Sequence, residues 1–155
     1  MARKEIKLKD ILRLSRKELQ RCKLHLACFN GTEEPLDVYL HDRDAWIGWN
    51  AARTGRNDFN RPLIFCLIRD YHRDDVWLFA GILEVVERYT DWKETGIGYK
   101  VEMTDIGAEF AGRLMVGFHR YPGLRGRSFK LETFYKDMTV HEILDKPYEI
   151  KLIYG

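Results

Sequence analysis

Two apolar runs joined by a short polar connection constrain the fold of this chain more than any other feature. The first run is Leu63 to Arg69 and the second is Val76 to Val86, and both are apolar at nearly every position. The charged connection between them, residues 70–75, has the length of an antiparallel hairpin turn. Strands that are apolar on both faces are usually covered on both faces, so we expect this hairpin at the centre of a barrel or covered sheet. Gly81 inside the second run predicts a bulge or a tight bend.

The remaining elements are shorter and predict an α+β domain. Residues 22–29 alternate with period two, which is typical of a strand with one buried face. Further strands are expected at residues 99–103, 113–118, 129–131 and 140–144, short helices at 10–14 and 133–138, and a turn or one-turn helix at 104–111. With 155 residues and no internal repeat or linker, the chain is expected to form one domain, residues 1–155. We predict a curved, mostly antiparallel β-barrel with a few short helices.

A tryptophan-containing helix is predicted after the strand at residues 22–29, and its residues suggest a pocket. Asp42 or Asp44 can cap a helix that runs as far as Arg53. A pocket for an unstacked base needs flat side chains for stacking, and amides or charges that read the base edge. This stretch supplies such groups in Trp46, Trp49, Asn50, Arg53 and Asn60. The alternative is that the tryptophans pack the helix onto the sheet, since amphipathic helices usually bury their bulkiest face.

A basic segment late in the chain is the strongest functional signal. Between Glu109 and Glu132 there is no acidic residue, although the whole chain holds 26 Lys and Arg against 24 Asp and Glu. The basic residues there are Arg113, His119, Arg120, Arg125, Arg127 and Lys130, interleaved with aromatic residues and glycines. Guanidinium groups make forked hydrogen bonds to phosphate oxygens, so a polyanion is the natural partner. The alternative is that these side chains pair with distant acids and only solvate a strand edge.

The sequence shows no recognisable catalytic or cofactor motif, and we predict no cofactor. Gly96-Ile97-Gly98-Tyr99 lacks the third glycine of a dinucleotide loop and predicts a tight hairpin turn instead. Asp70, Asp74 and Asp75 could bind a metal, but acids in a polar turn are most often solvated. The chain is therefore predicted to be non-catalytic.

The cysteines and the hydropathy indicate an intracellular protein. Cys22, Cys28 and Cys66 form no CxxC pair and are expected to be buried thiols, without zinc-ligand spacing to any histidine. No apolar run reaches the ~18 residues that a membrane span requires, and the charged N-terminus does not look like a signal peptide. We predict a cytoplasmic protein without a membrane partner.

Several stretches resemble the PUA-like barrels of the EVE and ASCH types, and more specifically the N-terminal region of bacterial GIY-YIG nuclease family proteins. The matching stretches are residues 35–38, 42–46, 63–68, 77–86, 98–101, 112–114 and 138–144. The resemblance implies a PUA-like fold that binds RNA or modified bases in DNA and that targets an attached nuclease. The paired GIY and YIG motifs of the nuclease domain are not matched in this chain, so no catalytic residue is carried over.

These observations give one main functional hypothesis and two alternatives. The main hypothesis is a non-catalytic nucleic-acid-binding module, with DNA favoured over RNA, in which Arg113, Arg120, Arg125, Arg127 and Lys130 meet phosphates. One alternative is an interaction or homodimerisation domain whose basic edge meets an acidic partner. A weaker alternative is a small hydrolase that uses the carboxylates of residues 70–75.

Overall fold

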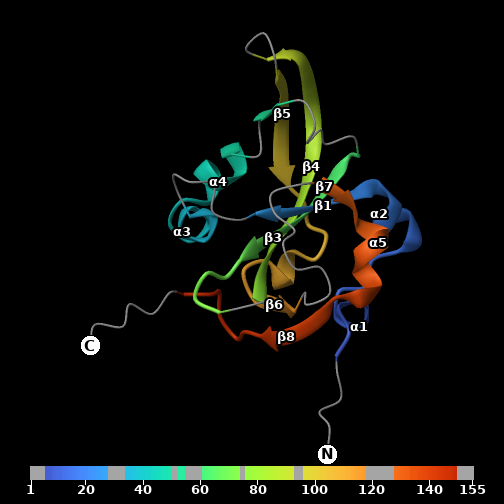
Figure 1. The fold of residues 1–155 in the computed structure, drawn as a ribbon, viewed down its shortest axis with the longest axis vertical. Helices are drawn as coiled ribbons and strands as arrows, with labels where there is room; N and C mark the ends of the chain where they lie inside the picture. Colours follow the sequence, from blue (N-terminus) through green and yellow to red (C-terminus); the bar gives the residue numbers. More distant parts are fainter. Residues whose placement is uncertain are drawn as a thin grey trace, which may run out of the picture.

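The computed structural model of the protein describes residues 6–27, 34–49, 52–54, 61–73, 76–92, 96–117 and 128–149. The strands are β1 (Cys22–Ala27), β2 (Ala52–Thr54), β3 (Leu63–Arg69), β4 (Val76–Trp92), β5 (Gly96–Met103), β6 (Leu114–Gly117), β7 (Ser128–Lys130) and β8 (Thr139–Ile143). The helices are α1 (Leu8–Ile11), α2 (Arg16–Arg21), α3 (Pro35–His41), α4 (Arg43–Trp49) and α5 (Leu131–Phe134), with 3-10 turns η2 (Ala108–Phe110) and η3 (Tyr135–Asp137). The strands form one sheet in the order β2-β5-β4-β3-β1-β7, and β6 joins it by pairing with β4 and with β8 (Figure 1).

The predicted hairpin is confirmed as β3 and β4. These strands pair antiparallel from Leu63 opposite Glu84 to Arg69 opposite Trp77. At Gly81 the register shifts by one residue and the backbone takes φ +123°, so the predicted bulge is present. A Cβ at this position would lie 2.6 Å from the sulfur of Met103. The positive φ therefore favours glycine here, and a larger residue would also have to displace the Met103 side chain.

The sheet is not closed into a barrel, and this part of the fold prediction was wrong. β1 pairs parallel with β3 on one side and antiparallel with β7 on the other. The path ends at β2 and β7 and the branch ends at β8; within the described ranges no ladder joins these three strands. Helices instead cover the apolar surface that barrel closure would have hidden. The architecture is an α+β domain with a mixed sheet.

The core has two halves, one on each face of the sheet. Alternate residues of β3 divide between them, with Phe65 in one half and Ile64 in the other. The first half is completed by buried residues of α1 and α5, including Leu8 and Leu131. The second is completed by α3 and α4, including Tyr39. This explains why β3 is apolar at nearly every position.

The helices and the short strand β2 differ most from the predictions. Neither α2 nor α3 was predicted to be helical. Asp42 caps α4 as expected, since its Oδ1 accepts from the backbone N–H of Ala45 at 3.1 Å. That helix ends at Trp49, and Arg53 lies in β2, where it pairs with Ile97 of β5. Tertiary pairing with β5 thus decides the conformation of residues 52–54, and it also places Gly96 and Gly98 in a strand rather than in the predicted turn. None of the helices in these described ranges is long and apolar enough to span a membrane.

Candidate nucleic-acid interface

The late basic segment meets the described sheet at β7. Lys130, its last basic residue, is exposed and lies opposite Lys23 in the antiparallel register of β1 and β7. Arg120, Arg125, Arg127 and His119 lie outside the described residues. The structure therefore locates one end of the segment beside a second lysine, at the end of the sheet.

The acid that follows β7 is engaged by an arginine from elsewhere in the chain. Arg61 donates to the two carboxylate oxygens of Glu132 at 2.6 and 2.9 Å. This forked hydrogen bond lowers the pKa of Glu132 and raises that of Arg61. The same guanidinium donates to the backbone carbonyl of Cys22 at 3.1 Å. Glu132 is thus the partner of Arg61, and Arg61 joins the end of α2 to α5.

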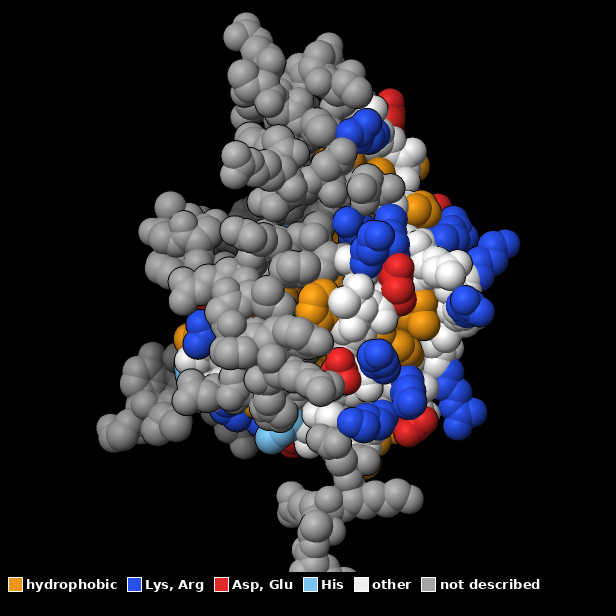
Figure 2. All heavy atoms as spheres, turned by 45° about the vertical axis from the view of Figure 1, so that its right-hand side comes forward, with side chains coloured by type: hydrophobic (Ala, Val, Ile, Leu, Met, Phe, Trp, Pro, Cys, Tyr) orange, Lys and Arg blue, Asp and Glu red, His pale blue; other side chains and the backbone are white. Residues whose placement is uncertain are grey.

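Exposed basic side chains also lie on elements close to β7 and α5. The exposed ones are Lys9, Arg13, Arg16, Lys17, Arg21, Lys130 and Lys136, which we call the N-terminal basic face. The elements that carry them are adjacent, because α2 contacts α5, α1 contacts η3 and β1 pairs with β7. Figure 2 shows Lys and Arg side chains over the right-hand part of this view, with several Asp and Glu side chains among them.

The sequence contained a signal for this face that was not used. Residues 7–23 hold seven basic residues, Lys7, Lys9, Arg13, Arg16, Lys17, Arg21 and Lys23, against two acids, Asp10 and Glu18. Because Asp10 and Glu18 lie among these charges, the stretch is not an acid-free run like the late segment. A windowed charge count would have found them. Their proximity to Lys130 needed the β1–β7 register.

Arg113, the first arginine of the late segment, has a role inside the protein. Its Nε donates to the carbonyl of Leu144 at 3.0 Å and its Nη1 to that of Glu109 at 3.2 Å. It immediately precedes β6, which β4, β3 and β1 separate from β7 in the hydrogen-bonded order of the sheet. The structure therefore does not bring Arg113 onto the strand that carries Lys130, and its donors help to hold residues after β8.

Trp46, a predicted pocket residue, packs in the core. It is 2% exposed and meets the ring of Tyr39 edge-on, with the ring centroids 4.9 Å apart. Arg43 lies over the other side of this cluster, with its guanidinium carbon 3.6 Å from the Tyr39 ring centroid. For Trp46 the packing alternative holds, and its ring offers no open face for a base.

The other predicted pocket residues are only partly covered by the structure. Trp49 ends α4 and Arg53 lies in β2, but their side chains are outside the described part, as are Asn50 and Asn60. The two elements have a common neighbour, because α4 contacts β5 and β2 pairs with β5. The backbone thus carries Trp49 and Arg53 to the same region of the sheet.

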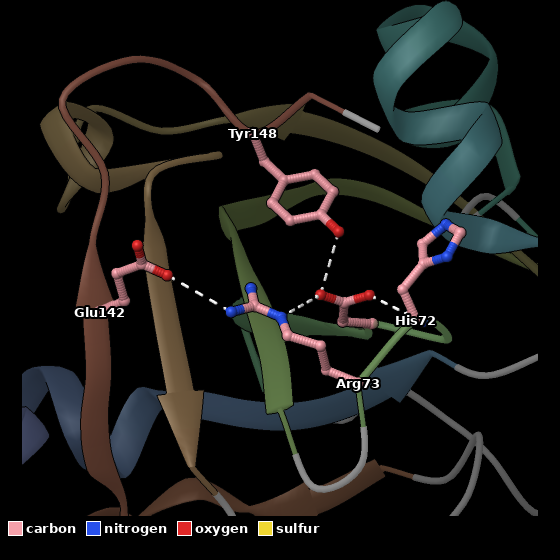
Figure 3. Close-up of polar contacts among 5 residues, drawn as sticks. His72, Arg73, Glu142 and Tyr148 are labelled. Carbon is pink, nitrogen blue, oxygen red and sulfur yellow. Dashed lines mark hydrogen bonds and ion pairs between the residues drawn. The ribbon is translucent and has the colours of Figure 1, made fainter. Parts of the chain in front are cut away.

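The carboxylate of Asp70 is buried and accepts from two residues of its own turn and from Tyr148. It accepts from the backbone N–H of His72 at 2.9 Å, from Nε of Arg73 at 3.0 Å and from the Tyr148 hydroxyl at 3.0 Å (Figure 3). Arg73 also donates to Glu142 of β8 at 3.3 Å. Burial and the nearby Asp70 charge raise the pKa of Tyr148 to about 12, so its hydroxyl keeps the proton that it donates. This network ties the β3–β4 turn to the end of the described chain.

The described residues offer little for catalysis or metal binding. No group of three His, Cys, Asp or Glu side chains among them could hold a metal ion; Asp74 and Asp75 lie outside this part. Cys22 and Cys66 are free thiols and buried, as predicted, while Cys28 is not described. Burial and then the Glu18 charge raise the pKa of Cys22 to about 12, which keeps it a neutral thiol and a poor nucleophile.

Comparisons with known proteins do not assign a family. No protein-family model matches the chain, no curated protein matches it, and no solved structure matches it. The resemblance to PUA-like and GIY-YIG-associated regions therefore stays a prediction.

Proposed function

We propose that this chain is a non-catalytic nucleic-acid-binding module whose late basic segment contacts the phosphate backbone. The proposal assigns phosphate contacts to Arg120, Arg125, Arg127 and Lys130. Arg113 is left out because its guanidinium donates to backbone carbonyls. Such contacts give affinity and strong salt dependence without reading sequence.

One observation carries the proposal: Lys130 is exposed beside Lys23, while the acid two residues later is bound by Arg61. The alternative for the late segment was that distant acids neutralise its charges. Glu132, the acid that follows this segment, is instead bound by Arg61. The positive potential of this edge is therefore available to an anionic ligand.

The finer parts of the proposal concern fold type and specificity. We assign the domain to the PUA-like type, acting in the cytoplasm on DNA in preference to RNA. Trp49, Asn50, Arg53 and Asn60 are proposed to accept a single base, with modified bases as candidates. The approach of α4 and β2 to β5 supports this grouping for Trp49 and Arg53.

The test is binding of labelled oligonucleotides across a range of salt concentrations. Replacing Arg125 and Arg127 with alanine removes two proposed phosphate contacts, so the slope of log K against log salt should fall by about 1.8 for a duplex, at about 0.9 per contact. The control is Arg69→Ala with Lys146→Ala, which removes the same charge from exposed sites beside the Asp70 turn. Lys23 pairs with Ile64 near the start of β3, whereas Arg69 is the last residue of that strand. Unchanged affinity and slope in the Arg125/Arg127 variant would count against the proposal.

A second candidate is an interaction or homodimerisation domain. The observation that favours it is the position of β7 at the end of the sheet path, since edge strands can pair with another chain. Light scattering separates the two candidates. A monomer that binds oligonucleotides supports the first, and a stable dimer without nucleic-acid affinity supports the second.

A further inference from the structure

We infer that the N-terminal basic face is a second row of phosphate contacts and that its ligand is a double-stranded nucleic acid. This inference rests on the proposed function and deepens it. It adds residues before β1 that the late segment does not include, and it specifies the form of the ligand.

The charge balance of the segments that carry this face differs in sign from that of the rest of the chain. Residues 7–23 and 128–137 together with Arg61 contain ten basic residues (seven, two and one) and four acids, Asp10, Glu18, Glu132 and Asp137. Their balance is +6. Since the whole chain carries 26 basic and 24 acidic residues, the remainder carries 16 against 20, or −4. In a chain that is nearly neutral overall, these segments thus carry a strong positive excess, which would orient the protein toward a polyanion.

The acids Glu132 and Glu18 on this side have partners within the fold. Glu132 is bound by Arg61. Glu18 closes a capping box at the start of α2: its Oε1 accepts from the Ser15 N–H at 2.9 Å, and the Ser15 hydroxyl accepts from the Glu18 N–H at 3.0 Å. These acids hold the helices in place, while the lysines and arginines of the N-terminal basic face are exposed.

The face is also held in a fixed arrangement before any ligand binds. The capping box sets the beginning of α2, and Arg61 bonds to the Cys22 carbonyl just beyond its end. Tyr135 of η3 donates its hydroxyl to the carbonyl of Leu12, which fixes the segment after α1. Preorganised cations lose less conformational freedom when phosphates bind.

Among the described side chains of this face none is an exposed aromatic, and this favours a duplex over a single strand. Single-strand binders stack successive bases on exposed aromatic side chains. Residues 7–27 contain no Phe, Tyr or Trp, and the described aromatic side chains of residues 130–137, Phe134 and Tyr135, are buried at 8% and 5% exposure. Exposed cations without aromatic side chains beside them can bind the phosphates of a duplex, whose bases are already stacked.

The deciding variant is Lys17→Ala with Arg21→Ala. These residues are four apart on α2, so they lie on one side of it, and alanine keeps the helix propensity. The probe is a short labelled DNA duplex, compared with one of its strands alone. For the duplex we expect roughly 10- to 50-fold weaker binding at 0.1 M salt and a salt slope smaller by about 1.8. Arg69→Ala with Lys146→Ala is the charge-matched control and should leave duplex binding within about twofold, because exposed charges beyond a Debye length are screened.

The outcomes separate this inference from the proposed function. If the Arg125/Arg127 variant loses affinity while the Lys17/Arg21 variant does not, the N-terminal row is refuted and the proposed function stands. Tighter binding of the single strand than of the duplex refutes the duplex assignment alone. Equal losses in the control variant refute a localised row. If the unaltered protein binds neither probe, the proposed function itself fails.

Discussion

Arginines on the two sides of the sheet have different partners. On the side of α1, α2 and α5, Arg13, Arg16 and Arg21 are exposed, although Nε of Arg13 also donates to the Asp10 carbonyl at 3.3 Å, and Arg61 is bound to Glu132. On the side of α3 and of residues 144–149, Arg69 is exposed but three other described arginines bind groups of the protein. Arg43 stacks on Tyr39, Arg73 joins Asp70 to Glu142, and Arg113 donates to two carbonyls.

This difference shows that the role of a basic residue can be inferred only when its partners in the folded protein are known. Arg113 and Lys130 belong to the same acid-free segment, yet one holds the chain after β8 and the other is exposed on β7. The side of α3 therefore should respond to substitution through stability, and the N-terminal basic face through binding. The predictions below test this separation.

Trp46→Ala should give the largest effect on stability. The side chain is 2% exposed and packs against Tyr39, so its removal leaves a cavity that the surrounding residues fill only in part. We expect a loss of about 3–5 kcal/mol in the free energy of unfolding, measured by urea denaturation. A loss below about 1 kcal/mol, combined with loss of oligonucleotide binding, would mean that Trp46 acts in base binding and not in the core.

Asp70→Ala should come next. The change leaves the His72 N–H, the Tyr148 hydroxyl and Arg73 without the carboxylate they share. Removing one partner of a buried charged network destabilises by about 3 kcal/mol. Tyr148→Phe, which removes a single donor, is the graded comparison at about 1 kcal/mol. Asp70→Ala and Tyr148→Phe, where folded, should bind oligonucleotides as the unaltered protein does. Loss of binding without loss of folding would mean that this turn takes part in oligonucleotide binding.

The core of the fold could be predicted because its signals are local. The apolar runs of β3 and β4, the glycine at position 81 and the cap at Asp42 each follow from adjacent residues. The parallel pairing of β1 with β3 is not local, since Cys22 meets Leu63 across a long stretch of chain. Sheet closure depends on such pairings, so the barrel was a reasonable prediction and still wrong.

The candidate site was harder to predict, for a similar reason. The acid-free segment was visible, but nothing nearby in sequence shows that Arg113 donates to Leu144 or that Glu132 binds Arg61. The contribution of residues 7–23 depends on Lys23 lying opposite Lys130. Charge patterns identified the chemistry, whereas the partners required tertiary structure.

Arg61→Ala tests the separation between binding and stability, because Arg61 lies on the side of the N-terminal basic face but bonds to groups of the protein. Its loss removes hydrogen bonds to Glu132 and to the Cys22 carbonyl, and we expect about 1–2 kcal/mol of destabilisation since the pair is partly exposed. It also leaves the Glu132 carboxylate uncompensated close to Lys130, so duplex binding should weaken. Adding Glu132→Gln should restore much of the binding and little of the stability. Glu132→Gln alone is the matched control.

The pH dependence of the same pair gives the smallest effect and an independent check. The hydrogen bond from Arg61 holds the folded-state pKa of Glu132 below its ordinary 4.5. A depressed carboxyl pKa contributes stability that is present above about pH 4.5 and is lost as the pH falls through the folded-state value. Urea denaturation at pH 7 and at pH 3 should therefore show a smaller acid-induced loss in Arg61→Ala than in the unaltered protein. Equal losses in both would mean that Glu132 has no folded-state partner, and its charge would then oppose the phosphate contacts proposed beside it.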